Sequence, residues 1–243
     1  MDFWLQYGQQ ASVDWCEPNY IVSPYVAEWY NCISSLPILF GAIFGIWYYR
    51  NLFGNLLPRY YIGFVGMALV GLGSAAFHGT LLRYPQASDE LPMVYLGTHM
   101  LYLIIFRGKG RHYHDAHRTK MNLWAIIMVL YLVFFTLTYF LYEDYFIFFI
   151  STYISIVTYI VIRSGYLVYK KHRAKFLKRM YWSAVLFYVG GVFVFWAPSQ
   201  FILPCDHWFQ WIEPHAIFHL TSAIGTYTYL AFSMHDHYSY KEI

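Results

Sequence analysis

The sequence has little charge. Only 12% of its 243 residues are Asp, Glu, Lys or Arg, about half the share expected of a soluble globular domain. Hydrophobic residues make up 59%, and aromatic residues 23%. The formal net charge is only +3, and the basic residues lie in short segments between apolar runs, so nothing indicates nucleic-acid binding. This composition is typical of an integral membrane protein with much interfacial surface.

Cysteine and targeting signals are also scarce. The three cysteines are Cys16, Cys32 and Cys205, and no CxxC motif occurs among them. The first 27 residues lack a basic segment followed by an apolar one, so we expect no cleavable signal peptide. We expect the first apolar span to act as its own insertion signal. No soluble domain, low-complexity linker or convincing internal repeat interrupts the chain.

Long apolar segments dominate the rest. About 20 apolar residues are needed to cross a bilayer as a helix. The sequence therefore predicts an all-α integral membrane protein, a bundle of seven transmembrane helices, at 27–48, 60–82, 90–106, 122–142, 145–163, 180–198 and 214–234. This divides the chain into an N-terminal segment, 1–26, a seven-transmembrane catalytic domain, 27–234, and a short tail, 235–243.

The connecting segments divide the basic residues very unequally. With seven spans, fifteen of the sixteen Lys and Arg residues fall on one side of the membrane, and only Arg83 falls on the other. Cytosolic loops carry the excess of Lys and Arg. We therefore predict that the N-terminus is luminal or outside and that the C-terminus is cytosolic. An even number of spans would break this alternation.

Three histidines lie inside the apolar spans. His78 is about 6 Å below the luminal end of the second predicted helix, and His219 is similarly shallow in the seventh. His215 and His219 form an i, i+4 pair on one helix face. An ionisable residue within a membrane span indicates a functional site. Since all three occupy one leaflet, they can converge on a metal, and three His ligands with an open position are typical of catalytic zinc.

The residues between His215 and His219 offer no general base. Asp89 is the best candidate, because it is predicted to start the third helix on the same side of the membrane. Ser74 lies one turn before His78 on its face of the second helix. Zinc makes water a nucleophile at neutral pH, and a carboxylate can take its proton and deliver it to a leaving amine. These residues together predict a zinc hydrolase.

Simpler interpretations remain for each residue. Asp89 could be only a helix N-terminal acid, and Ser74 could be one of several small residues that permit close helix packing, with Gly71 and Gly73. For His99, deeper in the third span, we favour a hydrogen bond to a neighbouring helix. Six further histidines are expected to be solvated, in loops or in the tail: His112, His114, His117, His172, His235 and His237.

Four short segments contain the residues discussed above or lie near the N-terminus: GLGSAAFHGTL at 71–81, DELPM at 89–93, HAIFH at 215–219 and DWCEPNY at 14–20. Together with Glu28, these segments resemble the alkaline ceramidases. The resemblance runs in order through the whole chain. That family belongs to a superfamily of seven-span membrane proteins that includes the adiponectin receptors.

The resemblance implies a zinc amidase of sphingolipid metabolism, located in the endoplasmic reticulum or Golgi membrane. Its substrate would be ceramide, hydrolysed to a sphingoid base and a free fatty acid. It implies zinc binding by His78, His215 and His219, with Asp89 and Ser74 assisting the water and the reacting carbonyl.

The resemblance also implies a calcium ion beside the zinc. Its ligands would be Asp14, the Trp15 backbone carbonyl, Glu17, Asn19 and Glu28. From spacing alone a solvated acidic segment would be favoured, because the pattern is not an EF-hand. The oxygen-rich set nevertheless suits a hard cation, which would order the luminal mouth of the site.

Cys16 and Cys205 both fall in predicted luminal segments, where disulfides persist. We predict that they pair; two free luminal thiols are the alternative. Cys32, inside the first span, is expected to be a buried free thiol.

Two other functions remain open at this stage. One is a receptor-like member of the same superfamily, with structural zinc and weak hydrolase activity. The other is a transporter or an ordinary seven-helix receptor whose histidines line a pathway. Nothing in the sequence identifies a protein partner.

Overall fold

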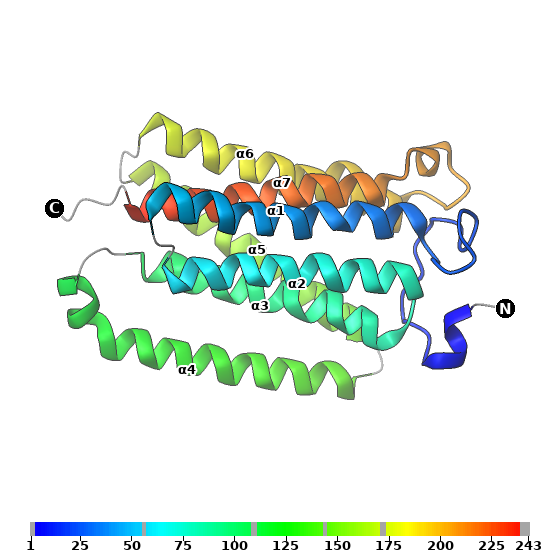
Figure 1. The fold of residues 1–243 in the computed structure, drawn as a ribbon, viewed down its shortest axis with the longest axis horizontal. Coiled ribbons are helices and arrows are strands. Elements are labelled where there is room, and N and C mark those ends of the chain that lie inside the picture. The colour runs from blue at the N-terminus through cyan, green and yellow to red at the C-terminus, as the bar shows by residue number, and fades with distance from the viewer. Residues whose placement is uncertain (1–2, 55–56, 108–110, 143–144, 171–173, 239–243) are drawn as a thin grey trace.

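The protein is a bundle of long helices that run along one common direction (Figure 1). The computed structural model describes residues 3–54, 57–107, 111–142, 145–170 and 174–238, with 111–115 described in backbone only. The seven α-helices are α1 (Trp29–Phe53), α2 (Pro58–Thr80), α3 (Arg83–Ile105), α4 (Arg111–Leu141), α5 (Tyr145–Lys170), α6 (Lys175–Gly191) and α7 (Pro214–Tyr238). The described residues contain no β-strand. The predicted all-α class is therefore confirmed.

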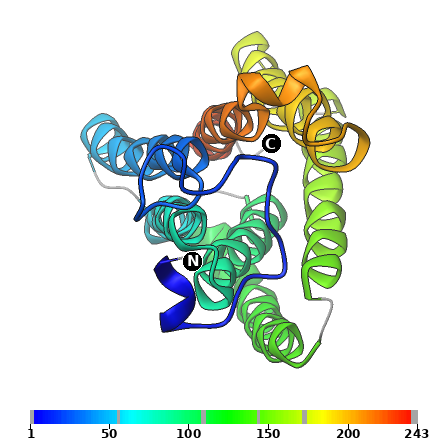
Figure 2. The same cartoon turned by 90° about the vertical axis from the view of Figure 1, so that its right-hand side faces the viewer.

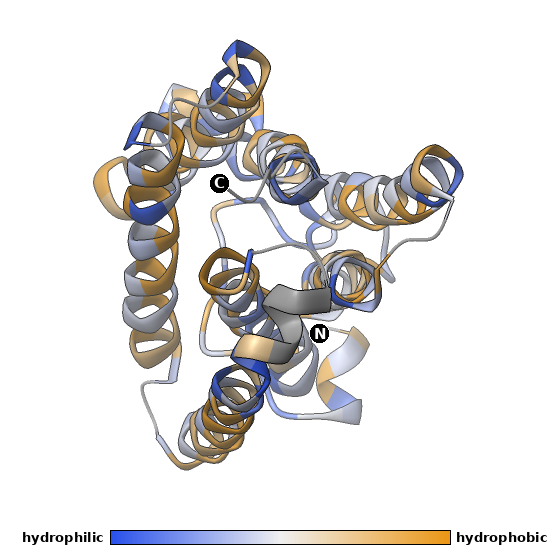
Figure 3. Ribbon diagram, turned by 90° about the vertical axis from the view of Figure 1, so that its left-hand side faces the viewer, coloured by the Kyte–Doolittle hydropathy of each residue, from blue (hydrophilic) through white to orange (hydrophobic). Residues whose placement is uncertain are grey.

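Five of these helices are long and apolar enough to cross a membrane: α1, α2, α4 from Ala116 onward, α5, and α6 with its continuation to Ile202. That continuation consists of two stretches of wider, π-helical turns, Val192–Trp196 and Pro198–Ile202. Apolar residues dominate the helices in Figure 3. By contrast, α3 and α7 include the acidic and histidine residues singled out above, which lowers their hydropathy.

We call the end of the bundle that carries residues 3–28 and the α6–α7 connection the N-terminal end. There the N-terminal segment crosses over the ends of several helices (Figure 2). Backbone hydrogen bonds fix it to the turn between α2 and α3: Ala11 N to Leu81 O (2.8 Å) and Glu28 N to His78 O (2.9 Å). The disulfide Cys16–Cys205 joins it to the α6–α7 connection, as predicted. Residues far apart in sequence are thus held over one mouth of the bundle.

Two glycines let α2 approach its neighbours closely. A Cβ atom on Gly71 would lie 2.6 Å from the backbone nitrogen of Leu39 in α1. A Cβ atom on Gly73 would overlap the carbonyl oxygen of Ser88 in α3. Since Ser74 and Asp89 are the next residues along these two helices, the contact at Gly73 brings their side chains to one place.

The third helix begins earlier than predicted. It starts at Arg83, so Asp89 lies in its second turn, and the expectation that Asp89 begins this helix is wrong. Leu82 is extended, and Pro85 is only the third residue of the helix, where the missing N–H of proline costs no hydrogen bond.

The last helix extends further than predicted. Because α7 runs to Tyr238, His235 and His237 are helical. The expectation that His237 is solvated is wrong, whereas His235 is partly exposed. His237 is buried, 2.9 Å from the Arg59 guanidinium, and His235 packs against Tyr49.

The other histidines and the free cysteine have varied settings. His99 lies with Nε2 at 2.6 Å from the carbonyl oxygen of Arg59, which confirms its hydrogen bond to a neighbouring helix. Cys32 is free, as predicted, but only partly buried. His117 is partly exposed. His112, His114 and His172 lie outside the side chains that the structure describes.

We expect Gly73→Ala to destabilise the protein, because the added methyl group forces α2 away from α3. Overpacking of this kind costs about 1–3 kcal/mol. The matched control is Gly190→Ala in α6, where the new Cβ meets only a Leu186 methyl group at 3.7 Å. Thermal unfolding in detergent measures both. Equal melting temperatures for the two variants would contradict the close-packing account.

Candidate metal centre

The structure brings the three membrane-embedded histidines together at the N-terminal end of the bundle. His78 comes from the last turns of α2, and His215 and His219 come from the first turns of α7. Their candidate ligand nitrogens all lie within 4.8 Å of one another, and the ring centroids are 4.7–5.0 Å apart. All three side chains are buried. This is the geometry needed for a single metal ion.

Hydrogen bonds orient two of the three rings. Nδ1 of His78 lies 2.5 Å from Oε2 of Glu28. Nδ1 of His219 lies 3.1 Å from the carbonyl oxygen of Asn31. A neutral imidazole that donates from Nδ1 presents a lone pair on Nε2. Acceptors behind metal-binding histidines commonly fix the tautomer in this way.

The third ring, that of His215, has a buried nitrogen, Nδ1, without a hydrogen-bond partner among the described residues. The Trp15 ring packs edge-to-face against the imidazole, with centroids 4.6 Å apart. A buried polar atom without a partner is costly, and a coordinated metal would remove that cost. The residues present therefore fit a metal ion.

Asp89 and Ser74 lie next to this cluster. The Ser74 hydroxyl lies close enough to the Asp89 carboxylate to interact with it. Oγ of Ser35, on α1, is 3.0 Å from Oγ of Ser74. Both Asp89 and Ser74 line the same cavity as the three histidines. A carboxylate, a hydroxyl and a metal-binding group at one site are the parts that acyl-transfer chemistry requires.

The cavity itself is large and apolar. Its volume is about 520 Å³, and α2, α3, α5, α7 and α6 with its π-helical continuation supply most of its lining. Its histidine and carboxylate side chains come from the helix turns at the N-terminal end of the bundle. Ile154, Ile162 and Phe193 line it, yet are 54%, 67% and 71% exposed. The cavity therefore opens between α5 and α6 onto the apolar outer surface.

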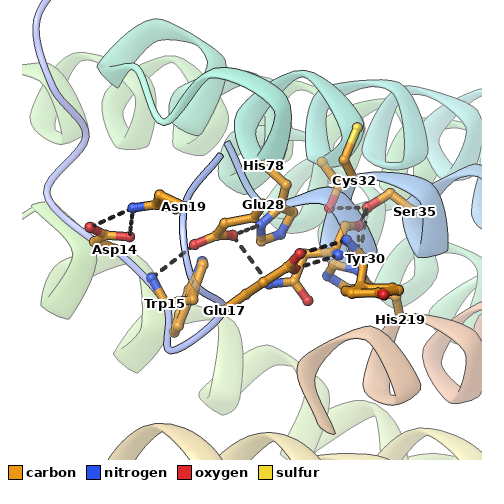
Figure 4. A network of polar contacts seen from close by, with 12 residues as sticks. Asp14, Trp15, Glu17, Asn19, Glu28, Tyr30, Cys32, Ser35, His78 and His219 are labelled. Atoms are coloured by element: carbon orange, nitrogen blue, oxygen red, sulfur yellow. Dashed lines mark hydrogen bonds and ion pairs between the residues drawn. The ribbon is translucent and has the colours of Figure 1, made fainter. Parts of the chain in front are cut away.

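The acidic N-terminal residues lie beside His78 (Figure 4). Both carboxylate oxygens of Asp14 accept from the Asn19 amide, at 3.0 and 3.1 Å. Oε1 of Glu28 accepts from the Trp15 backbone N–H at 3.0 Å. Glu17 accepts from backbone N–H groups in the first turn of α1, a favourable position for an anion. These side chains thus connect the N-terminal segment to α1 and to His78.

The oxygen atoms of these acidic residues do not converge on one point. Among the described residues only the three histidines bring three such ligand atoms together. Oδ1 of Asn19 is buried without a partner, however. Burial raises the pKa of Glu17, and the neighbouring Glu28 adds to this. Burial, with Glu17 and Glu28 nearby, raises the pKa of Glu213 to about 7. A surplus of carboxylates and a free amide oxygen fit a hard cation.

The sequence interpretation missed several groups. Asn31, Ser34 and Ser35 support His219 from α1, with Oγ of Ser34 2.9 Å from its Nδ1. Their i, i+3, i+4 spacing in an otherwise apolar span was a signal that could have found them. Glu213 was also missed, although the predicted span 214–234 begins directly after it and this position was a signal that could have found it.

Comparisons with known proteins give one consistent result. A family model described as Ceramidase matches residues 8–242. The putative alkaline ceramidase dcd3A of Dictyostelium discoideum is 29% identical over 91% of this chain and 85% of its own length. Alkaline ceramidase YPC1 of Saccharomyces cerevisiae is 28% identical over 90% and 74%. Alkaline ceramidase 3 of Mus musculus is 30% identical over 93% and 83%.

We expect the purified protein to contain a transition metal ion that depends on the histidine cluster. His215→Ala should abolish stoichiometric metal, because it removes one of the three imidazoles that converge in the cluster. The metal content is measured by elemental analysis after chelator washing. His99→Ala is the control, since it removes an imidazole far from the cluster. Equal metal content in the two variants would show that the cluster does not bind the ion.

Proposed function

Because this chain belongs to the ceramidase family, we propose that it hydrolyses the amide bond of ceramide to a sphingoid base and a free fatty acid. The observation that carries the proposal is the position of the three buried histidines. They lie with Asp89 and Ser74 at the polar end of an apolar cavity that opens toward the bilayer. A lipid with a polar, amide-containing head and apolar chains fits a cavity with histidines at one end and apolar side chains along the rest.

We propose that the metal is zinc, held by His78, His215 and His219. Three neutral imidazoles are a usual ligand set for catalytic zinc. Bound there, zinc would polarise the amide carbonyl and make water nucleophilic at neutral pH. Glu28 and Asn31, as acceptors for Nδ1 of His78 and His219, keep both rings in the ligating tautomer.

Asp89 is proposed as the general base and then the general acid. Its carboxylate takes a proton from the attacking water and returns it to the amide nitrogen as the carbon–nitrogen bond breaks. The sphingoid base then leaves as an amine, and the acyl group leaves as a fatty acid. Ser74, which lies beside Asp89, would donate a hydrogen bond to the oxygen that gains charge in the tetrahedral state.

The shape of the cavity suggests how the lipid arrives. Its opening lies between α5 and α6, where apolar side chains face outward. A membrane lipid can move sideways through it without bringing its alkyl chains into water. The head would then lie against the histidines, and the chains against α3, α5 and α6.

We propose a second metal, calcium, held by Asp14, the Trp15 carbonyl, Glu17, Asn19 and Glu28. Its support is the surplus of carboxylates and the unpartnered Asn19 oxygen described above. The ion would neutralise these acids and fix the N-terminal segment on the helix ends. Glu28 would then connect both metals, because its carboxylate also holds His78.

For the membrane arrangement we propose seven spans, with α3 and α7 crossing beside the five apolar helices. The N-terminal end, including residues 1–26, would face the lumen, and the 235–243 end would face the cytosol. The loop charges support this orientation. So does the disulfide, which suits the oxidising lumen of the endoplasmic reticulum or Golgi.

Purified wild-type protein should release fatty acid and sphingoid base in equal amounts from ceramide. Asp89→Asn should lower kcat by about 10²–10⁴-fold, the usual contribution of general acid–base catalysis, while its zinc content stays at the wild-type level. Ser88→Ala, at the exposed neighbouring position, is the control and should remain active. Full activity of Asp89→Asn would remove Asp89 from the mechanism; an inactive wild-type enzyme would overturn the proposed function.

Calcium should raise the melting temperature of the wild-type protein after treatment with a chelator. Asp14→Ala should remove that increase, since it takes away a carboxylate ligand at the start of the set. Asp206→Ala, an exposed acid next to the disulfide at the same end, should leave the increase intact. If Asp14→Ala responds to calcium like wild type, the ion binds elsewhere.

A further inference from the structure

Two tyrosines face each other across the interior, and neither takes part in the mechanism above. Tyr153 lies on α5 and Tyr188 on α6, and their hydroxyl groups hydrogen bond to one another. Both side chains line the large cavity. The hydrogen bond gives each hydroxyl a partner inside the bundle. The bond therefore holds both rings across the interior.

A second, smaller cavity lies beyond this pair. Its volume is about 70 Å³, and Tyr153 and Tyr188 line it as well. On α3 the large cavity ends at Leu96, whereas the small one reaches Met100. On α6 the large cavity ends at Tyr188, whereas the small one reaches Tyr181. On α3 and α6 the small cavity thus continues beyond the large one, away from the histidines, whereas on α5 the large cavity itself reaches the outward-facing Ile162 and the small one reaches Val161.

The surrounding helices hold the pair in this position. A Cβ atom on Gly225 of α7 would lie 2.7 Å from Cβ of Tyr188, so α6 and α7 are in close contact there. A Cβ atom on Gly97 of α3 would lie 3.9 Å from Cε2 of Tyr153 and 2.9 Å from Ile156. Neither ring can withdraw easily, because the helix behind it is already packed.

We propose that the Tyr153–Tyr188 pair is the end wall of the site for one alkyl chain of the substrate, and that it determines the longest chain accepted. This inference rests on the proposed function. A chain that reaches the wall must bend toward the opening between α5 and α6. Without the wall, the same chain extends into the second cavity. An apolar pocket discriminates by about tenfold or more for one methylene that does not fit.

The test compares two double variants that differ in one ring. Tyr153→Phe/Tyr188→Leu removes the hydrogen bond and opens the wall. Tyr153→Phe/Tyr188→Phe removes the same hydrogen bond but keeps both rings, so it is the matched control. In neither variant is a buried hydroxyl left unpaired, which limits the loss of stability. Tyr188→Trp, which enlarges the wall, tests the opposite direction.

The measurement is kcat/KM for two series of ceramides, one varied in the N-acyl chain and one in the sphingoid base. For one of the two series, Tyr153→Phe/Tyr188→Leu should raise the kcat/KM for long chains, relative to that for the chain length that wild type prefers, by about tenfold or more. The Phe control should keep the wild-type ratio, and Tyr188→Trp should shift preference to shorter chains. Unchanged ratios in active Leu and Trp variants would overturn the wall. Absence of ceramide turnover by wild type would instead refute the proposed function.

Discussion

The hydrogen bond between Glu28 and His78 is the interaction on which the site depends most. It joins the residue that precedes α1 to the end of α2, 2.5 Å apart with both side chains buried. The backbone repeats the connection, since Glu28 N donates to His78 O. Through Glu28 the N-terminal segment therefore positions an imidazole of the metal centre. Placing three imidazoles in apolar helices is costly unless each has such a role.

The helices around the histidine cluster are packed closely on the side of α1, α2 and α3, and they enclose a cavity on the side of α5 and α6. The glycine contacts of α2 with α1 and α3 bring Ser74 to Asp89, and α1 supplies polar support to His219. On the α5–α6 side the cavity stays apolar and opens outward. A cluster of buried histidines and an apolar cavity thus follow from one asymmetry of packing.

Much of this could be predicted from sequence because it depends on patterns that survive without tertiary detail. Apolar length predicted the helices, and loop charge placed His78 near His215 and His219; the Cys16–Cys205 pair followed from the same topology. The start of α3 could not be predicted, since proline in a first turn looks like a break. The burial of His237 depends on contacts with a distant helix, which local patterns do not encode.

The central claim is a zinc ion held by three imidazoles and no sulfur ligand. X-ray absorption at the zinc edge of the purified protein measures this most directly. The account predicts stoichiometric zinc with a first shell of nitrogen and oxygen at about 2.0–2.1 Å and the multiple-scattering signature of histidine. A shell containing sulfur at about 2.3 Å, or protein that binds no zinc, would contradict it.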